Sequence, residues 1–163
     1  MVQMTDPLAA LTSFQEVFET KGIALQPGVI DPALFVHLDQ PTGSPRFTYV
    51  RIDRRTVTAL VMFAQVPPLK GLPCFQMGVA VPEKYRAQGR AKEIVAAATA
   101  ELQNGLCRNG VAEFYIEAVV GTDNEPSKRV AAATISTDPV PITDEFSGLP
   151  ALHYLRKIKR DSA

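Results

Sequence analysis

One short segment of the chain combines residue types that can hold an anion. Residues 86–91 read Arg-Ala-Gln-Gly-Arg-Ala and lie between an apolar run that ends at Val81 and a long helical pattern. The first amide groups of a helix have no acceptor within the helix, and the helix dipole adds partial positive charge there. Gly89 carries no Cβ, so a phosphate group can approach the backbone closely. The segment therefore predicts a site for a pyrophosphate.

A single carboxylate lies within an otherwise apolar strand pattern further along the chain. Glu117 interrupts the run of Phe, Tyr, Ile, Ala and Val over residues 114–119. In that setting the carboxylate would be partly desolvated and suited to accepting a proton, directly or through a water molecule. The alternative interpretation is that Glu117 points to the solvent-facing edge of a sheet.

The composition favours a single soluble domain, which we predict over residues 1–163. Hydrophobic residues make up 46% and charged residues 21%, and 17 basic residues balance 17 acidic ones. A neutral chain makes a nucleic-acid partner unlikely, and no segment has the length and apolar character of a membrane span. Cys74 and Cys107 have neither metal-ligand nor redox spacing, and the two histidines lie far apart, so no metal is expected. Two scattered thiols fit a reducing compartment, and we predict a cytoplasmic location.

Periodicity predicts the elements that precede the 86–91 segment. Asp6 and Pro7 suit the start of a helix over residues 7–20, in which apolar residues recur at helical spacing. Short segments rich in Val, Phe, Thr and Tyr then predict strands. Several prolines and a glycine over residues 67–73 predict a loop before the last of them. The four predicted strands, expected to form an antiparallel meander, are Ala33–Asp39, Arg46–Asp53, Thr56–Gln65 and Cys74–Val81.

The elements after the segment are predicted in the same way. A helix follows from Ala91 to about Arg108, and Glu113–Val120 then predicts a strand. Because a strand, a helix and a strand in this order form a right-handed crossover, Glu113–Val120 should lie parallel to Cys74–Val81. Asn124 can cap a second helix over residues 125–134. The remainder predicts a broken hairpin whose last strand is Ala151–Lys157.

These features together resemble the GNAT superfamily of acyl-CoA-dependent N-acyltransferases. The family's pyrophosphate loop reads Arg/Gln-x-x-Gly-x-Gly/Ala, which this sequence matches at Arg86, Gly89 and Ala91, and Asn124-Glu125-Pro126-Ser127 follows at the expected distance. The resemblance is strong over residues 74–135 and weak over residues 1–73. It implies an α/β (α+β) fold with a mixed, mainly antiparallel sheet of six to seven strands flanked by helices. The fourth and fifth strands of that sheet are expected to run parallel and to splay apart.

The resemblance also implies how acetyl-CoA or another acyl-CoA binds. The pantetheine arm enters the wedge between the splayed strands and pairs with the backbone around Val79 and Val81. Asn124 contacts that arm or orders the start of the following helix. The diphosphate lies over the backbone amides of the loop, which belong to Arg86, Ala87, Gln88, Gly89, Arg90 and Ala91.

The implied reaction is direct attack of an amine on the bound thioester in a ternary complex. Many family members supply a tyrosine as general acid seven residues after the asparagine, but this chain has Ala131 there. Tyr154, or less favourably Tyr115, is a candidate replacement, although a tyrosine in a strand is commonly a packing residue. We therefore expect Glu117 and Tyr154 as catalytic residues. His153 should face the other side of its strand from Tyr154 and lie at the surface.

The acceptor implied is an amine on a small molecule or a peptide, and a homodimer is possible. An amine on an aminoacyl-tRNA is disfavoured by the neutral charge. Asp144 and Glu145 precede the last strand, where they could attract a cationic amine or simply aid solubility. Because Ala131 replaces the usual acid, a CoA-binding module without catalysis, acting as a sensor or interaction domain, is the alternative function.

Overall fold

The first helix begins and ends where the sequence predicts. The computed structural model describes residues 6–20 and 22–160. Helix α1 (Pro7–Thr20) is capped by Asp6, whose side chain accepts a hydrogen bond of 3.2 Å from the Ala9 amide. Its buried residues, Leu11 and Phe14, face the sheet and join a small apolar cluster with strand residues such as Leu60 and Met62.

The strands form one sheet in the described residues, with the order β1-β2-β3-β4-β5-β6-β8-β7. All neighbours are antiparallel except β5 and β6, which are parallel. The two-residue strand β1 adds an edge that the sequence pattern did not predict, so the sheet has eight strands here. The strands are β1 (Gln26–Pro27), β2 (Leu34–Asp39), β3 (Arg46–Asp53), β4 (Thr56–Leu69), β5 (Leu72–Ala80), β6 (Glu113–Gly121), β7 (Val140–Thr143) and β8 (Pro150–Lys159).

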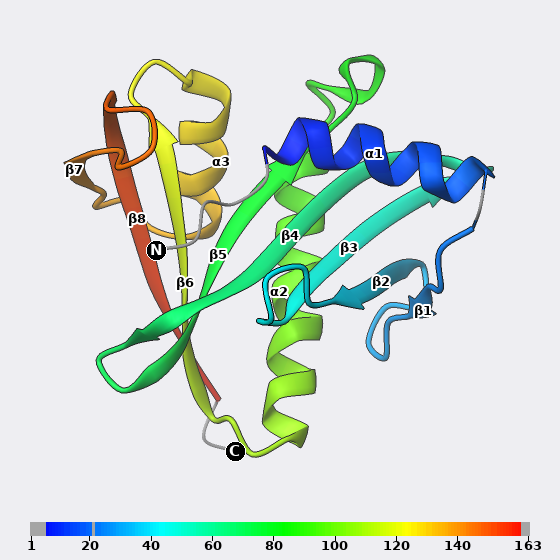
Figure 1. Ribbon diagram of the computed structural model, residues 1–163, viewed down its shortest axis with the longest axis horizontal. Coiled ribbons are helices and arrows are strands. Elements are labelled where there is room, and N and C mark those ends of the chain that lie inside the picture. Colours follow the sequence, from blue (N-terminus) through cyan, green and yellow to red (C-terminus); the bar gives the residue numbers. More distant parts are fainter. Residues whose placement is uncertain (1–5, 21, 161–163) are drawn as a thin grey trace.

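The parallel pair comes apart after three residues. Its register joins Cys74 to Tyr115, Phe75 to Ile116 and Gln76 to Glu117, and no pairing follows. Strand β5 nevertheless continues to Ala80 and β6 to Gly121. Figure 1 shows the two ribbons diverging toward the end that carries α3. The expectation of parallel, splayed strands in the middle of the sheet is thus confirmed.

The predicted loop over residues 67–73 is wrong. Strand β4 runs on through Pro67 and Pro68 and returns as β5 through a tight turn at Lys70 and Gly71, which both have positive φ. The prolines fit because the register between β4 and β5 shifts between Val66 and Leu69. Proline cannot donate to a ladder, and an irregularity of this kind removes the need for its missing N–H.

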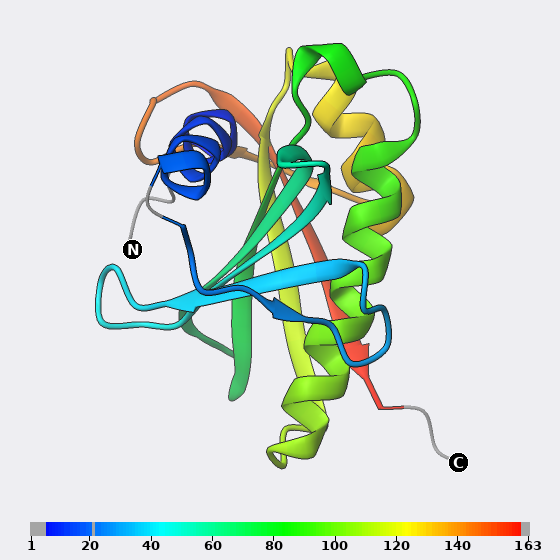
Figure 2. The same ribbon diagram turned by 90° about the vertical axis from the view of Figure 1, so that its right-hand side faces the viewer.

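Helices cover both faces of the sheet. Figure 2 shows α1 on one side and α2 (Arg90–Arg108) and α3 (Glu125–Thr134) on the other. The main core lies between α2, α3 and the sheet, where α2 buries an apolar stripe that includes Ile94, Ala98 and Leu102. This packing sets α2 beside β5, so that the turn between them lies at the splayed end of the parallel pair.

Candidate functional site

The turn before α2 has the geometry of an open anion site. Gly89 is the N-cap residue of α2 and has a φ of 73°, and Ala87 also has a positive φ of 60°. A Cβ built on Gly89 would meet no atom within 4 Å, so the space above the turn is free. Among the described residues, no acceptor pairs with the backbone amides of Ala87, Gln88 or Gly89. These donors and the helix terminus can together accept a phosphate group.

The side chains of the same turn hold it in shape. The Arg86 amide donates to the Glu83 carbonyl (3.2 Å), and its Nε donates to the Val81 carbonyl (2.9 Å), tying the turn to the end of β5. Arg90 donates from Nε to Gln88 Oε1 (3.1 Å) and lies over the Tyr85 ring at 5.0 Å. The Arg86 amide is therefore already paired, and the open donors begin at Ala87.

The splayed strands offer a backbone edge next to this turn. Val79 pairs with Val61 of β4 on one side and has no partner in β6 on the other. Val81, which follows the last residue of β5, is buried in the main core. Asn124 caps α3 by accepting a hydrogen bond from the Ser127 amide (3.2 Å), so it orders the start of that helix at the far side of the wedge.

A carboxylate and an imidazole meet where the parallel pair ends. Glu117 is the last residue of β6 paired with β5, and its Oε2 lies 2.7 Å from His153 Nε2 of β8. The two side chains are 16% and 25% exposed, so Glu117 is not a solvent-facing edge residue. His153, expected at the surface, is 25% exposed and joins this contact. Sequence alternation gave the face of His153, but the register between β6 and β8 that brings it to Glu117 is a long-range property.

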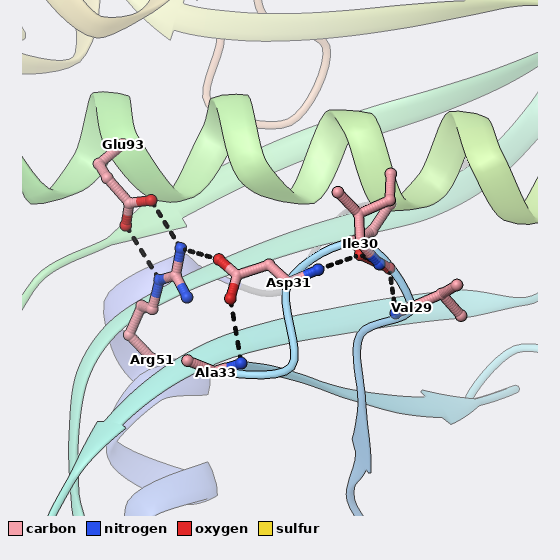
Figure 3. A network of polar contacts seen from close by, with 7 residues as sticks. Val29, Ile30, Asp31, Ala33, Arg51 and Glu93 are labelled. Carbon is pink, nitrogen blue, oxygen red and sulfur yellow. Dashed lines mark hydrogen bonds and ion pairs between the residues drawn. The ribbon is translucent and has the colours of Figure 1, made fainter.

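Figure 3 shows the contacts that hold α2 against the sheet. Arg51 of β3 forms a two-pronged ion pair with Glu93 in the first turn of α2 (3.0 and 2.6 Å) and a second pair with Asp31 (2.6 Å). About two turns further along α2, buried Glu101 accepts hydrogen bonds from the amides of Val29, Ile30 and Asp31. Both contacts fix the position of α2, and with it the position of the Gly89 turn.

Comparison with known proteins identifies the fold. No protein-family model and no curated protein matches the sequence. Solved structures do match: the ribosomal L7/L12 acetyltransferase RimL in complex with CoA, a chimera of the Vibrio cholerae spermidine N-acetyltransferase SpeG with human SSAT, and the NatC complex bound to Gag peptide and CoA. The chain has the GNAT fold.

The likeness lies in the arrangement of the chain and not in its residues. The TM-scores with RimL, SpeG and NatC are 0.50, 0.51 and 0.50, at identities of 18%, 11% and 12%. The match with RimL covers 71% of this chain and 64% of RimL. The match with SpeG covers 69% of each chain, and the match with NatC covers 96% of this chain and 84% of the NatC chain. The match thus spans less than two thirds of the RimL chain. RimL and SpeG are acetyltransferases by name, and the NatC complex was solved with CoA.

Within the GNAT fold, the two predicted catalytic residues lie on opposite faces of the sheet. Tyr154 is 3% exposed and shares the main core with Ala131 of α3, on the face covered by α2 and α3. It pairs in register with Ala118, one residue beyond Glu117, and side chains alternate between the faces. No described residue forms a hydrogen bond with its hydroxyl. Glu117 and Tyr154 therefore flank the end of the parallel ladder instead of meeting each other.

Cys74 is a potential nucleophile on the same face of the sheet as Glu117, and its environment keeps it unreactive. The thiol is 2% exposed, and Cys74 lies opposite Tyr115 in the ladder. Burial raises the pKa of the Cys74 thiol to about 12, and the negative charge of Glu117 adds to this effect. Since the thiolate is the nucleophilic form, Cys74 is a neutral packing residue near pH 7.

The remaining candidates are Asp144, Glu145 and Tyr115. In the connection between β7 and β8, Asp144 is half-buried and Glu145 is exposed, and the Asp144 carboxylate accepts from the Phe146 amide (2.9 Å) as part of the turn. Tyr115 is 8% exposed and sits on the Glu117 face beside Cys74. No three His, Cys, Asp or Glu side chains gather as a metal site within residues 6–20 and 22–160. Nor does any helix among those residues have the length and apolar character needed to cross a membrane.

Proposed function

We propose that this protein is an N-acyltransferase that moves an acetyl group from acetyl-CoA to an amine. The observation that carries the proposal is the parallel pair β5–β6, whose ladder stops at Gln76 and Glu117 beside the open turn at Gly89. A ligand with an extended amide-containing arm and a diphosphate matches these two features together. The RimL and NatC structures, which share the fold, were solved with CoA, and this supports the same class of ligand here.

The proposed cofactor site runs from the wedge to the helix. The diphosphate would contact the amides of Ala87, Gln88 and Gly89 and the first turn of α2, beginning at Arg90 and Ala91. The pantetheine arm would lie along β5 and pair with the backbone at Val79 and Val81. Arg86 and Asn124 would act mainly by shaping the site, since each already bonds the backbone of its own turn.

The proposed reaction is direct transfer in a ternary complex. The Glu117–His153 pair lies on the face of the sheet opposite α2 and α3, so an amine arriving there would meet the thioester from the face that α2 and α3 do not cover. Tyr154, on the helix side of the same place, is the candidate proton donor for the leaving thiolate in the absence of a tyrosine at position 131. The neutral, buried Cys74 argues against a route through an acyl-cysteine intermediate.

Calorimetric titration with CoA and acetyl-CoA tests the site, and Gly89→Glu is the variant that locates it. A carboxylate at residue 89 would occupy the place of the diphosphate and repel it, so binding should be lost. Gly110→Glu is a matched control, because Gly110 lies just beyond the other end of α2, also has a positive φ (86°) and also has no atom within 4 Å of a built Cβ. If both variants bind CoA equally well, the diphosphate lies elsewhere.

A CoA-binding module without catalysis is the second candidate, and the buried Ala131 at the family's acid position favours it. Thiol release from acetyl-CoA separates the two functions. The acceptors to test are spermidine, peptides with a free N-terminus, amino acids and an aminoglycoside. Release with one of them supports the transferase, and tight binding of acetyl-CoA with no release from any acceptor supports the module.

A further inference from the structure

The Glu117–His153 contact determines which ring nitrogen of His153 can accept the proton that an amine must lose. A carboxylate has no hydrogen to donate, so in a neutral imidazole Nε2 carries the hydrogen and donates it to Glu117 Oε2 at 2.7 Å. The other ring nitrogen, Nδ1, then holds the lone pair. Among the described residues nothing forms a hydrogen bond with His153 Nδ1, and no unpaired side-chain nitrogen or oxygen is sealed from solvent. Nδ1 is therefore an accessible proton acceptor.

The position of the histidine suits this role better than the position of the carboxylate. Glu117 sits at the last paired residue of the parallel ladder, whereas His153 lies opposite Val119, two residues further into the splayed part of the sheet. His153 is also the more exposed of the two side chains, at 25% against 16%. The neighbours of the pair on this face include the neutral thiol of Cys74, Tyr115, and Lys157 and Glu113, whose charges pair with each other (3.4 Å).

We infer that His153 Nδ1 is the catalytic base of the proposed transferase and that Glu117 is the positioning residue which fixes its tautomer. This inference rests on the proposed function and changes the role of Glu117 from base to support. The logic is that of any carboxylate–imidazole pair in which the carboxylate stabilises the imidazolium that forms.

The step balances without any further reactant. An N–H bond of the substrate ammonium breaks, and the proton bonds to Nδ1, leaving a neutral amine and an imidazolium held by Glu117. The amine lone pair forms the new C–N bond at the thioester carbonyl. The C–S bond breaks and its electron pair goes to the CoA sulfur, which takes a proton from the Tyr154 hydroxyl, and the second proton of the nitrogen then restores Tyr154. The imidazolium then releases its proton to solvent.

Kinetics with the best acceptor found in the panel tests the assignment. His153→Gln keeps an N–H donor for Glu117 but has no base, so kcat should fall about 10²- to 10⁴-fold, the usual contribution of a general base, with an unchanged Kd for acetyl-CoA. Glu117→Gln keeps an acceptor for Nε2 and should lose less of kcat than His153→Gln. His37→Gln, a change of the other histidine, should leave kcat unchanged. A His153→Gln rate near that of the wild type, or a larger loss in Glu117→Gln, would overturn the assignment.

The tautomer can be measured on the folded protein without an acceptor. Long-range ¹H–¹⁵N correlation spectra distinguish Nε2–H from Nδ1–H histidines, and the two histidines of this chain should give opposite results. His37 Nδ1 faces the Ala24 carbonyl at 3.2 Å and must carry its own hydrogen, whereas His153 should carry it on Nε2. An Nδ1–H tautomer at His153 contradicts the inference. Binding of acetyl-CoA with no thiol release from any acceptor would instead remove the transferase function itself, and the role of His153 with it.

Discussion

The surroundings of two glutamates, Glu101 of α2 and Glu117 of β6, differ. Glu101 of α2 is 7% exposed and accepts hydrogen bonds from three consecutive backbone amides, those of residues 29–31. Glu117 of β6 has one partner, the imidazole of His153, and both lie at an accessible part of the sheet. Backbone donors cannot titrate or move away, whereas an imidazole can take and release a proton. The first carboxylate thus fastens the fold, whereas the partner of the second can exchange a proton.

The packing around Glu101 is correspondingly tight. A Cβ on Gly28 would lie 2.5 Å from the Asp31 carbonyl oxygen and 2.9 Å from the carboxyl group of Glu101. Only glycine allows the loop to approach the carboxylate this closely. The neighbouring Arg51 closes the loop from the other side through Asp31.

Glu101→Gln should produce the largest change in stability. The amide NH₂ of glutamine would face a backbone donor, and the unpaired buried groups that result cost about 3 kcal/mol of unfolding free energy. Urea denaturation followed by circular dichroism measures the change. Glu93→Ala on the same helix is the control, since the Glu93 side chain is 53% exposed and its loss should cost at most about 1 kcal/mol. Equal effects of the two variants would contradict the anchoring role of Glu101.

Gly28→Ala should destabilise the protein by about 1–3 kcal/mol, because the added methyl group must displace either the loop backbone or the Glu101 carboxylate. Gly105→Ala is a control of opposite sign. Gly105 lies inside α2 with open space around a built Cβ, and alanine there should stabilise the helix by about 0.5–1 kcal/mol. Thermal unfolding of both variants gives the comparison. A neutral Gly28→Ala would mean that the loop is not held against Glu101.

Asp31 provides a smaller, pH-dependent contribution on the Glu101 side of the comparison. The Asp31 carboxylate accepts hydrogen bonds from Arg51 and from the Ala33 amide. These bonds, that from Arg51 most, lower the pKa of the Asp31 carboxyl below its ordinary 3.8. A folded-state pKa below the unfolded one adds stability that is fully present above the unfolded pKa and is lost as the pH falls through the folded pKa. At about pH 6, Asp31→Asn should therefore unfold at a lower urea concentration than the wild type. Below about pH 4, the difference between the two urea midpoints should become smaller. A constant difference over that range would contradict the linkage.

Glu117→Gln should have the smallest effect on stability. Glutamine retains an acceptor for His153 Nε2, so the unfolding free energy should change by less than about 1 kcal/mol. The chemical change is the same as in Glu101→Gln, which makes the pair a direct test of the two environments. Urea denaturation measures both under one set of conditions. A loss at residue 117 as large as at residue 101 would place Glu117 among the structural anchors.

Much of the fold follows from local patterns. The caps at Asp6 and Asn124, the helical stripes and the alternating strands are short-range features, and the helix and strand positions follow them closely. The loop predicted at Pro67 and Pro68 failed because proline is normally excluded from a ladder, and only the partner strand reveals an irregularity that accepts it. The two-residue strand β1 is too short to show any period.

The candidate site was predictable in part, for the same reason. The turn at Gly89 is a local motif, whereas the contact of Glu117 with His153 spans 36 residues and depends on strand register. One signal for Glu101 was present in the sequence: it lies three residues after Ala98 and next to Leu102, at a position of the helical stripe that should be apolar. A carboxylate at such a position indicates that it has a buried polar partner. The position alone does not show which residues supply that partner.

The early end of the β5–β6 ladder also bears on which molecules can occupy the centre of the sheet. Beyond Gln76 and Glu117, each strand presents amide and carbonyl groups to the other without a mutual bond. An aliphatic chain inserted between the strands would remove water from these groups without replacing the lost hydrogen bonds. Each group left without a partner would cost about 1–3 kcal/mol of binding free energy. A guest built with its own peptide-like linkages would instead replace the missing rungs. The unpaired main-chain groups of β5 and β6 therefore disfavour apolar ligands between the strands. Substitution of side chains would change this preference little.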